Sequence, residues 1–352
     1  MTPIQLSKHL LNITDIEAEA SRLMEPGLRS NVNDGVLNNE TLEANVDAFK
    51  QLRIRPRYMV DVSQRDLSVK VVGGDTIPMP IAGSPSALHK RFHPDGEFAT
   101  GKGIRQKSTV MILSSYSSIT IEELAAAEPD LIKWFQMYIY CDRNMTIDLA
   151  QRAKQSGYRA LVLTVDYTTR GRRYHDIKNQ FKNIYPKVNY NRYNVSQLSK
   201  VVAKDNVWRD IRWLKETTGL PIVIKGILTA EDARLAVDNG ADAILVSNHG
   251  GRQLDGSPAT LEALPEIVEA VGREVDVYMD GGVRTGADVF KALAIGAKVV
   301  FVGRPVCWGL ICNGSDGVRQ VLDILYNELD NYMTIAGTPT VGDITRNHIR
   351  YT

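Results

Sequence analysis

The feature that most constrains the fold is an alternation of short apolar runs with segments of helical pattern, from about residue 79 onward. Each run is rich in aliphatic residues and ends in polar residues or glycine. Near-continuous apolar character is typical of parallel strands that are covered on both faces. We predict strands in MPIAGS (79–84), VMILSS (110–115), IKWFQMY (132–138), ALVLTVD (160–166), PIVIKG (221–226), AILVSNHG (243–250), VYMDGG (277–282) and VVFVGR (299–304).

The connecting segments carry the start and stop signals of helices. In GILTAEDARLAVDNG, Thr229 stands at an N-cap position and Gly240 follows the last turn. VRTGADVFKALAIG repeats this layout with Thr285 and Gly296. Eight strand–helix units of this size predict an α/β fold, the (β/α)8 TIM barrel. A doubly wound open sheet is the alternative, but the glycine fingerprint expected at its first helix is not found.

We predict a single domain over residues 1–352, with the barrel at 79–352. The length and the 43% hydrophobic content are sufficient for one large core. Residues 1–78 are interpreted as a cap, with helices in EAEASRLM and NETLEANVDAFKQL and short strands in RPRYMV and SVKVV. Residues 167–205 are polar and too long for an ordinary connection. They predict a lid loop after the fourth strand, with a solvated surface loop as the alternative.

The composition argues against several classes of partner. The 42 basic and 41 acidic side chains nearly balance, so we expect neither nucleic acid nor a membrane surface as a partner. No apolar run approaches ~18 residues, so we expect no membrane span. Three cysteines without histidine-backed spacing predict free thiols and no metal site. The chain starts without a secretory pattern and ends in HIRYT rather than Ser-Lys-Leu, which favours the cytoplasm, with the peroxisome as the alternative.

Polar and ionisable residues collect where the predicted strands end. In a barrel of this kind, the loops after the strands meet at one mouth and carry the chemistry. Random strand ends would hold Gly, Asn and Ser and far fewer ionisable groups. The residues in question are Ser114, Gln136, Tyr138, Thr164, Asp166, Lys225, Ser247, His249, Arg252, Asp280 and Arg304. We therefore predict an active site at this mouth.

The last two strands predict a phosphate site. They end in DGGVR (280–284) and GR (303–304). Glycines let backbone N–H groups approach an anion, and the following helix N-termini favour negative charge. The barrel's usual phosphate site lies at the same two loops. Asp280 is placed to accept from a sugar or ribityl hydroxyl, while tight-turn glycines and a solvated arginine are the alternative.

Lys225 and His249 suggest redox chemistry on an acid. A lysine that ends a buried strand is costly unless it meets an anion, such as a flavin ring that gains charge on reduction. A structural ion pair is the alternative. His249 is the histidine at a strand end, and Asp166 can hold its second N–H. Arg252 and Arg173 together suit bidentate capture of a carboxylate, although each alone fits a solvated side chain.

Taken together, the chain resembles the FMN-dependent 2-hydroxy acid oxidase and dehydrogenase family, which includes glycolate oxidase, lactate oxidase and mandelate dehydrogenase. The resemblance runs from about residue 41 to 349. It is carried by SNHGGRQLDG with PATLEALPEIVEAV, and by DGGVRTGADVFKALAIGAKVVFVGRP. Further matches are HPDGE, LSSYSS, WFQMYIYCDR, LTVDYTTRGRRYHDIKNQF and IVIKGILTAEDARLAV.

The resemblance implies roles for the matched positions. His249 would be the base, oriented by Asp166, and Tyr138 would bond the substrate oxygen. Arg173 and Arg252 would hold the substrate carboxylate. Lys225 would stabilise reduced FMN at its pyrimidine edge. The other FMN contacts that the resemblance implies are Pro85, Ser86, Ala87, Ser114, Gln136, Thr164 and Ser247 for the ring, and Asp280, Gly282, Arg284, Gly303 and Arg304 for the ribityl chain and phosphate.

Two positions depart from the family pattern. The tyrosine that typical members carry in the first helical segment falls on Asn31, and Tyr116 stands where glycolate oxidases of plants and animals have tryptophan. A missing phenol donor weakens carboxylate binding by roughly 0.5–1.5 kcal/mol. Glycolate and lactate are therefore in doubt as the substrate.

The resemblance predicts oxidation of an (S)-2-hydroxy acid to the 2-oxo acid, with O2 reduced to hydrogen peroxide in a homotetramer. One alternative is a dehydrogenase that uses another acceptor, and another is a degenerate FMN-binding member with low turnover. A flavin isomerase and a flavin-free barrel that acts on a phosphorylated substrate are the further alternatives. A yellow colour would exclude the flavin-free barrel, and bleaching of bound flavin by a 2-hydroxy acid would exclude the isomerase and the degenerate member. The rate at which air reoxidises the reduced flavin separates the oxidase from the dehydrogenase.

Overall fold

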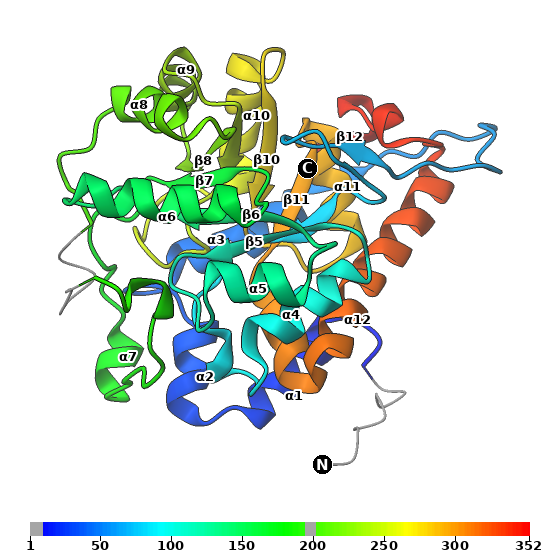
Figure 1. Ribbon diagram of the computed structural model, residues 1–352. Helices are drawn as coiled ribbons and strands as arrows, with labels where there is room; N and C mark the ends of the chain where they lie inside the picture. The colour runs from blue at the N-terminus through cyan, green and yellow to red at the C-terminus, as the bar shows by residue number, and fades with distance from the viewer. Residues whose placement is uncertain (1–9, 194–201) are drawn as a thin grey trace.

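Eight parallel strands close into a barrel in the computed structural model, which describes residues 10–193 and 202–352 (Figure 1). Each strand pairs with its neighbour in parallel, and β11 returns to β4 to close the ring. The strands are β4 (Ile81–Gly83), β5 (Val110–Ser114), β6 (Ile132–Met137), β7 (Leu161–Thr164), β8 (Ile222–Ile227), β9 (Ala243–Val246), β10 (Asp276–Asp280) and β11 (Val299–Val302). The predicted TIM barrel is confirmed, and the open sheet is excluded.

Helices surround the barrel and begin where the sequence predicts. The Thr229 side chain accepts from the backbone N–H of Asp232 at 3.2 Å, and Thr285 caps its helix through Asp288 at the same distance. Gly296 ends that helix at φ +128°, a backbone conformation that favours glycine. The helices are α4 (Gly96–Arg105), α5 (Ile121–Ala127), α6 (Arg143–Gln155), α8 (Arg209–Thr218), α9 (Ala230–Asp238), α10 (Thr260–Val271), α11 (Gly286–Ile295) and α12 (Arg304–Ala336).

The interior of the barrel is filled with side chains. Trp134, Tyr278 and Phe301 are fully buried, and their ring centres lie 5.7–5.8 Å apart. Smaller residues such as Val162 and Val223 complete this cluster. Burying each large apolar side chain contributes roughly 1.5–3 kcal/mol. A ligand therefore has room at the mouth of the barrel and not along its axis.

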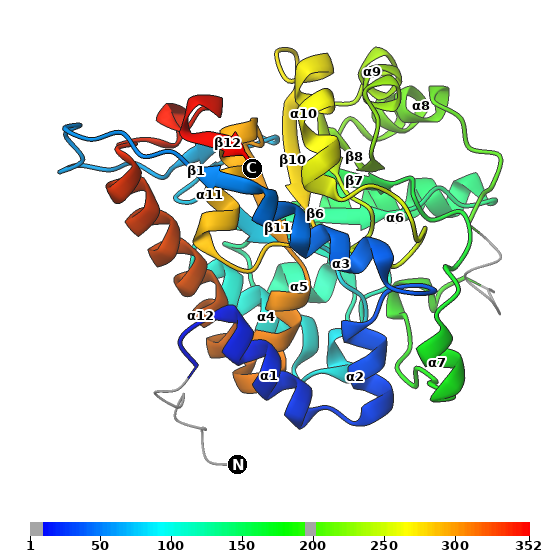
Figure 2. The same cartoon turned by 180° about the vertical axis from the view of Figure 1, so that it is seen from behind.

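The N-terminal segment packs on the outside of the barrel. It forms α1 (Ile13–Leu23), α2 (Pro26–Asn33), α3 (Glu40–Asp47) and the 3-10 helix η1 (Ala48–Gln51). Figure 2 shows α1 beside α12, with which it is in contact. Strand β1 (Leu52–Ile54) pairs antiparallel with β12 (Ile349–Tyr351), so the end of the N-terminal segment meets the C-terminal strand. Helices α1 and α3 agree with the prediction, α2 has no counterpart in it, and the boundary at residue 78 stays a prediction.

One predicted strand is wrong. RPRYMV (55–60) forms no strand, and the pairing stops before it at Ile54. Pro56 has no N–H to donate to a ladder, and Met59 is fully exposed with φ +60°. The other predicted strand, in SVKVV, appears as β2 (Val69–Lys70), which pairs with β3 (Thr76–Ile77).

The long connection after β7 contains short helices. These are α7 (Tyr174–Lys178) and η3 (Val188–Tyr190), while residues 194–201 lie outside the described part. In both views α7 lies beside α2, and the two helices are in contact (Figures 1 and 2). The role of residues 167–205 as a lid stays a prediction. Over the described ranges, none of the helices combines the length and apolar character needed to cross a bilayer.

Candidate functional site

A cavity of about 380 Å³ lies at the mouth where the strands end. This volume is within the usual range for small-molecule sites. The predicted residues that line it are Pro85, Ser86, Ala87, Ser114, Gln136, Tyr138, Thr164, Arg173, Lys225, His249, Arg252, Asp280, Gly282, Arg284, Gly303 and Arg304. Asp166 and Ser247 stand behind this lining, in contact with residues that belong to it. The structure therefore brings all the predicted site residues together.

His249 is held by its neighbours in an unusual backbone conformation. Its φ is +58°, a left-handed conformation that few L residues adopt apart from Asn, Asp and His, and it has a cost in energy. Its backbone N–H donates to Ser247 Oγ at 3.1 Å, and its Nδ1 lies 2.8 Å from Asp166 Oδ1. The carboxylate thus fixes the proton on Nδ1, which leaves Nε2 as the nitrogen able to accept a proton.

Asp166 is suited to this orienting role because it stays ionised. Burial by itself raises its pKa, but the nearby His249 and Lys225 and the hydrogen bond from the imidazole outweigh burial, so the pKa of Asp166 is lowered. Its second oxygen, Oδ2, is buried without a hydrogen-bond partner. The pair therefore resembles the histidine–carboxylate arrangement that orients a general base.

A buried lysine and a buried aspartate meet at the centre of the mouth. Lys225 Nζ donates to Ser247 Oγ at 2.7 Å and lies 3.5 Å from Asp280 Oδ2. Ser84 also donates to Asp280 Oδ2, at 2.7 Å. The other oxygen, Asp280 Oδ1, is buried with no partner. An acceptor left open in this way is expected where a ligand brings hydroxyl donors.

Two arginines are positioned by the C-terminal end of α2. Arg252 Nη1 donates to the carbonyl oxygens of Asn31, at 2.8 Å, and of Asp34, at 3.0 Å. Arg304 Nε donates to the carbonyl of Val32 at 2.8 Å. Helix C-terminal carbonyls carry partial negative charge and favour cations. Helix α2 therefore fixes both guanidinium groups, and the remaining N–H groups of Arg252 are available to a ligand.

These guanidinium groups crowd one another. Burial and the positive charges of Arg173 and Arg304 lower the pKa of Arg252 well below its usual range. Burial, together with Arg284 and Arg173, lowers the pKa of Arg304 to about 10. The Nε of Arg173 is buried with no hydrogen-bond partner. A carboxylate or phosphate between them would offset both the repulsion and the missing hydrogen bond.

Tyr138 remains a neutral donor in this surrounding. Burial, and then the neighbouring Tyr140, raise the pKa of Tyr138 well above its ordinary value. Its ring packs 5.3 Å from Tyr116 and 5.0 Å from Tyr167, measured between ring centres. A phenol in this position can donate its proton to an oxygen of a bound acid.

The glycine turns after β10 pack too closely against their neighbours to accept a side chain. Gly281 and Gly282 have φ of +102° and +79°. A Cβ at residue 282 would lie 1.9 Å from the carbonyl oxygen of Asn45. Arg284 follows, with its guanidinium 4.8 Å from the centre of the Trp308 ring. Gly281, Gly282 and Arg284 line the cavity, while their role as a phosphate site stays a prediction.

A ladder of polar side chains crosses the floor of the cavity. Ser114 Oγ donates to Gln136 Oε1 at 3.2 Å, and Gln136 Nε2 donates to Thr164 Oγ1 at 3.1 Å. In the loop after β4, Ser86 Oγ lies 2.6 Å from His89 Nε2, and His89 is buried. A flat ring with polar edges would meet donors and acceptors here.

The sequence alone does not single out several residues that line the cavity. Arg91 and Lys187 lie away from the predicted strand ends. Tyr167 follows a predicted strand directly, but no pattern distinguishes it from the residues around it. Arg170 and Lys187 belong to the long polar connection, for which a solvated surface loop is the alternative prediction, yet both residues line the cavity. Ser84 also lines the cavity, and its position as the polar residue that ends MPIAGS is a signal in the sequence that could identify it.

Comparison with known proteins agrees with this geometry. Residues 20–351 match the family model described as FMN-dependent dehydrogenase. The chain is 44% identical to a peroxisomal (S)-2-hydroxyacid oxidase of Arabidopsis thaliana, over 97% of this chain and 96% of the relative. It is similar to a lactate oxidase of Pediococcus acidilactici (TM-score 0.94, 37% identity, 97% and 95% coverage). A soluble mutant of the membrane-associated (S)-mandelate dehydrogenase of Pseudomonas putida gives a TM-score of 0.92 at 30% identity, with 97% and 100% coverage.

Proposed function

Because the chain belongs to the FMN-dependent dehydrogenase family, we propose that it oxidises an (S)-2-hydroxy acid to the 2-oxo acid and passes the electrons to O2, which gives hydrogen peroxide. The observation that carries this proposal is the meeting of one imidazole–carboxylate pair with two guanidinium groups at one cavity. His249 and Asp166 are 2.8 Å apart there, and Arg173 and Arg252 line the same space.

The residues present fit FMN. The open acceptor of Asp280 suits a ribityl hydroxyl, and the left-handed turn at Gly282 with Arg284 suits the phosphate. Lys225 lies within 3.5 Å of Asp280, where it would offset negative charge on a ring edge. The segment Pro85–Ala87 and the polar ladder at Gln136 would flank the ring. Bound FMN supplies the acceptor for the two electrons that leave the substrate.

The protein residues bind, orient and deprotonate the acid. Arg173 and Arg252 would take the carboxylate through parallel N–H groups, which fixes the orientation of C2. Tyr138 would donate to a substrate oxygen. His249 Nε2 would accept the proton that the substrate loses during its oxidation, and Asp166 would stabilise the imidazolium that results.

A second candidate function is a dehydrogenase that uses another electron acceptor. The relative named as a mandelate dehydrogenase favours it, while the relatives named as oxidases favour O2. Reaction of the reduced protein with air-saturated buffer in a stopped-flow instrument separates the two. Reoxidation that is slow compared with turnover by an artificial acceptor would exclude the oxidase.

Anaerobic mixing with a panel of (S)-2-hydroxy acids tests the proposal directly. At least one acid should bleach the flavin absorbance of the wild-type protein. His249→Ala should keep FMN and lose bleaching by roughly 10²- to 10⁴-fold, the usual contribution of a general base. A yellow protein that no acid in the panel bleaches would instead be the degenerate family member.

The assembly and location also belong to this proposal. We infer a homotetramer from the resemblance to the family, which native mass measurement checks. The free cysteines Cys141, Cys307 and Cys312 favour a reducing compartment such as the cytosol. Because one relative is named as peroxisomal, imaging of an internally tagged copy should include a peroxisome marker.

A further inference from the structure

The cavity holds more positive charge than the proposed reaction uses. The described residues that line it include one carboxylate, that of Asp280, and eight cationic side chains: Arg91, Arg170, Arg173, Lys187, Lys225, Arg252, Arg284 and Arg304. A phosphate monoester carries roughly −1.5 to −2 charges at neutral pH, and the substrate adds one carboxylate. The proposed roles occupy five of the cations. Arg91, Arg170 and Lys187 have no part in them.

The three unassigned cations are linked to Arg173 through their charges. Arg91 ends η2 (His89–Arg91), Arg170 lies between β7 and α7, and Lys187 immediately precedes η3. Arg173 is close enough to Arg170 and Arg91 for their charges to oppose one another. Lys187 and Arg170 interact in the same way. The cluster therefore adjoins the arginine that would hold the substrate carboxylate.

This cluster is only partly neutralised by the protein. Asp176 supplies one carboxylate, which accepts from Arg170 Nη2 at 2.8 Å and lies 3.9 Å from Arg173 Nη1. Arg91 Nη1 donates at 2.8 Å to the side-chain oxygen of Asn31, which is uncharged. Its Nε is buried without a partner. Arg91 therefore keeps both its charge and an open donor in the cavity wall.

Asn31 connects Arg91 with the carboxylate of Asp176 in this cluster. Its oxygen accepts from Arg91, while its Nδ2 donates to both oxygens of Asp176 at 3.0 Å. The side chain is buried, with 3% of its surface exposed. An amide can bridge a cation and an anion because it both accepts and donates. Asn31, the residue that departs from the family pattern, thus positions Arg91 directly and Arg170 through Asp176.

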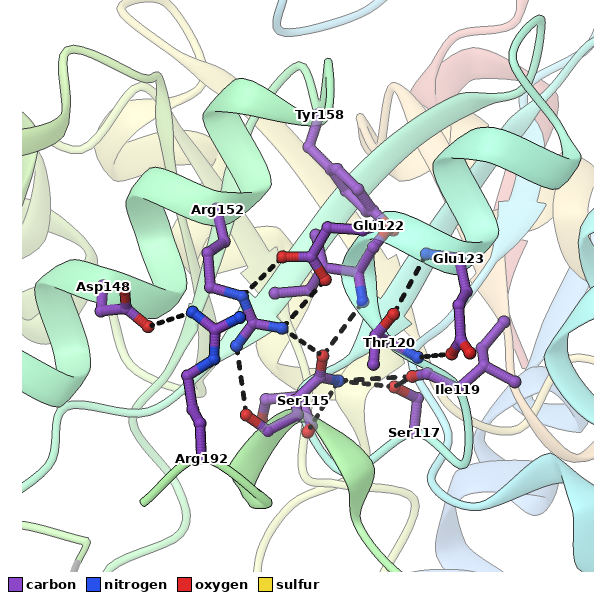
Figure 3. A network of polar contacts seen from close by, with 12 residues as sticks. Ser115, Ser117, Ile119, Thr120, Glu122, Glu123, Asp148, Arg152, Tyr158 and Arg192 are labelled. Atoms are coloured by element: carbon purple, nitrogen blue, oxygen red, sulfur yellow. Dashed lines mark hydrogen bonds and ion pairs between the residues drawn. The ribbon is translucent and has the colours of Figure 1, made fainter.

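The segment that carries Lys187 is anchored by a buried polar network (Figure 3). Asn189 is 1% exposed and donates to Ser117 Oγ at 2.8 Å. Arg152 donates to the carbonyl of Asn189 at 3.1 Å. Figure 3 shows Arg152 facing Glu122, with which it forms two hydrogen bonds of 2.6 and 2.9 Å. The position of Lys187 is therefore fixed by the fold.

The anchored lysine points toward the proposed substrate. Its Nζ lies 3.8 Å from the centre of the Tyr116 ring, which packs on Tyr138 at 5.3 Å between centres. Burial, and then the charge of Arg170, lower the pKa of Lys187 to about 8. Burial likewise lowers the pKa of Arg91 to about 10. Both groups would be stabilised by an anion in the cavity.

We propose that the substrate carries a second anion at the end of its side chain, bound by Arg91, Arg170 and Lys187, so that the preferred substrate is a 2-hydroxy dicarboxylic acid. This inference rests on the proposed function and names its substrate class. The first carboxylate would meet Arg173 and Arg252, and the second would meet the three added cations. A neutral side chain of the same size would leave those cations without a counter-charge.

The wild-type holoenzyme tests the proposal with pairs of acids that match in shape. (S)-malate is compared with (S)-2-hydroxy-4-methylpentanoate, and (S)-2-hydroxyglutarate with (S)-2-hydroxy-5-methylhexanoate. In at least one pair, kcat/KM should favour the diacid by roughly 10- to 100-fold, the value of a hydrogen-bonded charge. A protein that oxidises the neutral acids equally well or better overturns this inference and leaves the proposed function intact. A flavin that no acid reduces overturns both.

Variants then show which residues cause the preference for the diacid. Arg91→Met and Lys187→Met should each lower the diacid-to-neutral ratio by roughly 10-fold or more, while Arg172→Met should not change it. Arg172 is the matched control because it is exposed, follows Arg170 by two residues and does not line the cavity. Binding of succinate, followed by the flavin spectrum or by calorimetry, should weaken in the same order. An unchanged ratio and unchanged succinate binding in both variants would contradict the assignment.

Discussion

The link between helix α3 and the loop that carries His249 gives the sharpest stability prediction. Asn45 in α3 and Asn248 form a reciprocal amide pair, with Nδ2-to-Oδ1 distances of 2.9 and 2.8 Å. Asn45 Oδ1 also accepts from the backbone N–H of Thr260 at 3.2 Å. Both side chains are buried, at 2% and 5% exposed. Because His249 follows Asn248 directly, this pair supports its left-handed backbone.

Asn45→Ala should lower the free energy of unfolding by about 2–4 kcal/mol. The variant loses three hydrogen bonds, each worth about 0.5–1.5 kcal/mol net, and leaves the Thr260 N–H buried without its acceptor. Asn248 keeps its bonds to the carbonyl of Pro258, at 3.1 Å, and from the N–H of Gly251, at 3.2 Å, which limits the loss. We also expect a lower kcat, since the loop that positions His249 is loosened.

Urea unfolding of the FMN-saturated protein, followed by tryptophan fluorescence, measures the change. Asn239→Ala is the matched control, because its amide donates to the carbonyl of Leu235 at 2.8 Å in an exposed position. The control should stay within about 0.5 kcal/mol of the wild type, as surface substitutions usually do. Equal losses in Asn45→Ala and Asn239→Ala would refute the view that the buried amide pair holds α3 to the loop that carries His249.

Three further predictions follow from the cavity. Asp166→Asn should reduce the rate of flavin bleaching by roughly 10²-fold or more with FMN still bound, because the amide no longer stabilises the charged imidazole of His249; an unchanged rate would count against the orienting role. Gly282→Ala should lower the ratio of flavin to protein absorbance, since its φ is +79° and its Cβ would meet the carbonyl of Asn45 at 1.9 Å; full FMN content would show that the turn adapts. Burial lowers the pKa of Lys187 to about 8, so raising the pH from 7 to 9 should remove its charge. KM should then rise more for a diacid than for the neutral acid of matched shape, and steady-state assays at the two pH values check this.

The fold could be predicted because its signals are local and repeated. Each strand is an apolar run, and helix starts such as Thr229 and Thr285 are visible in the chain. The failure at RPRYMV has a local cause as well, since Pro56 cannot donate to a ladder. Patterning of this kind depends on burial and hydrogen bonding within a few residues, so it can be interpreted without coordinates.

The sequence by itself determined the barrel, the ends of its strands and hence the group of residues at its mouth, among them His249, Lys225 and Asp280. Only the tertiary structure decided which cations beyond that group reach the same cavity. Arg91 and Lys187 come from segments without a strand-end pattern, and they line the same cavity although they are nearly a hundred positions apart in the chain. The positive charge of these two residues reaches the site because loops distant in sequence pack on the barrel. Packing of that kind produces no periodic pattern in the sequence.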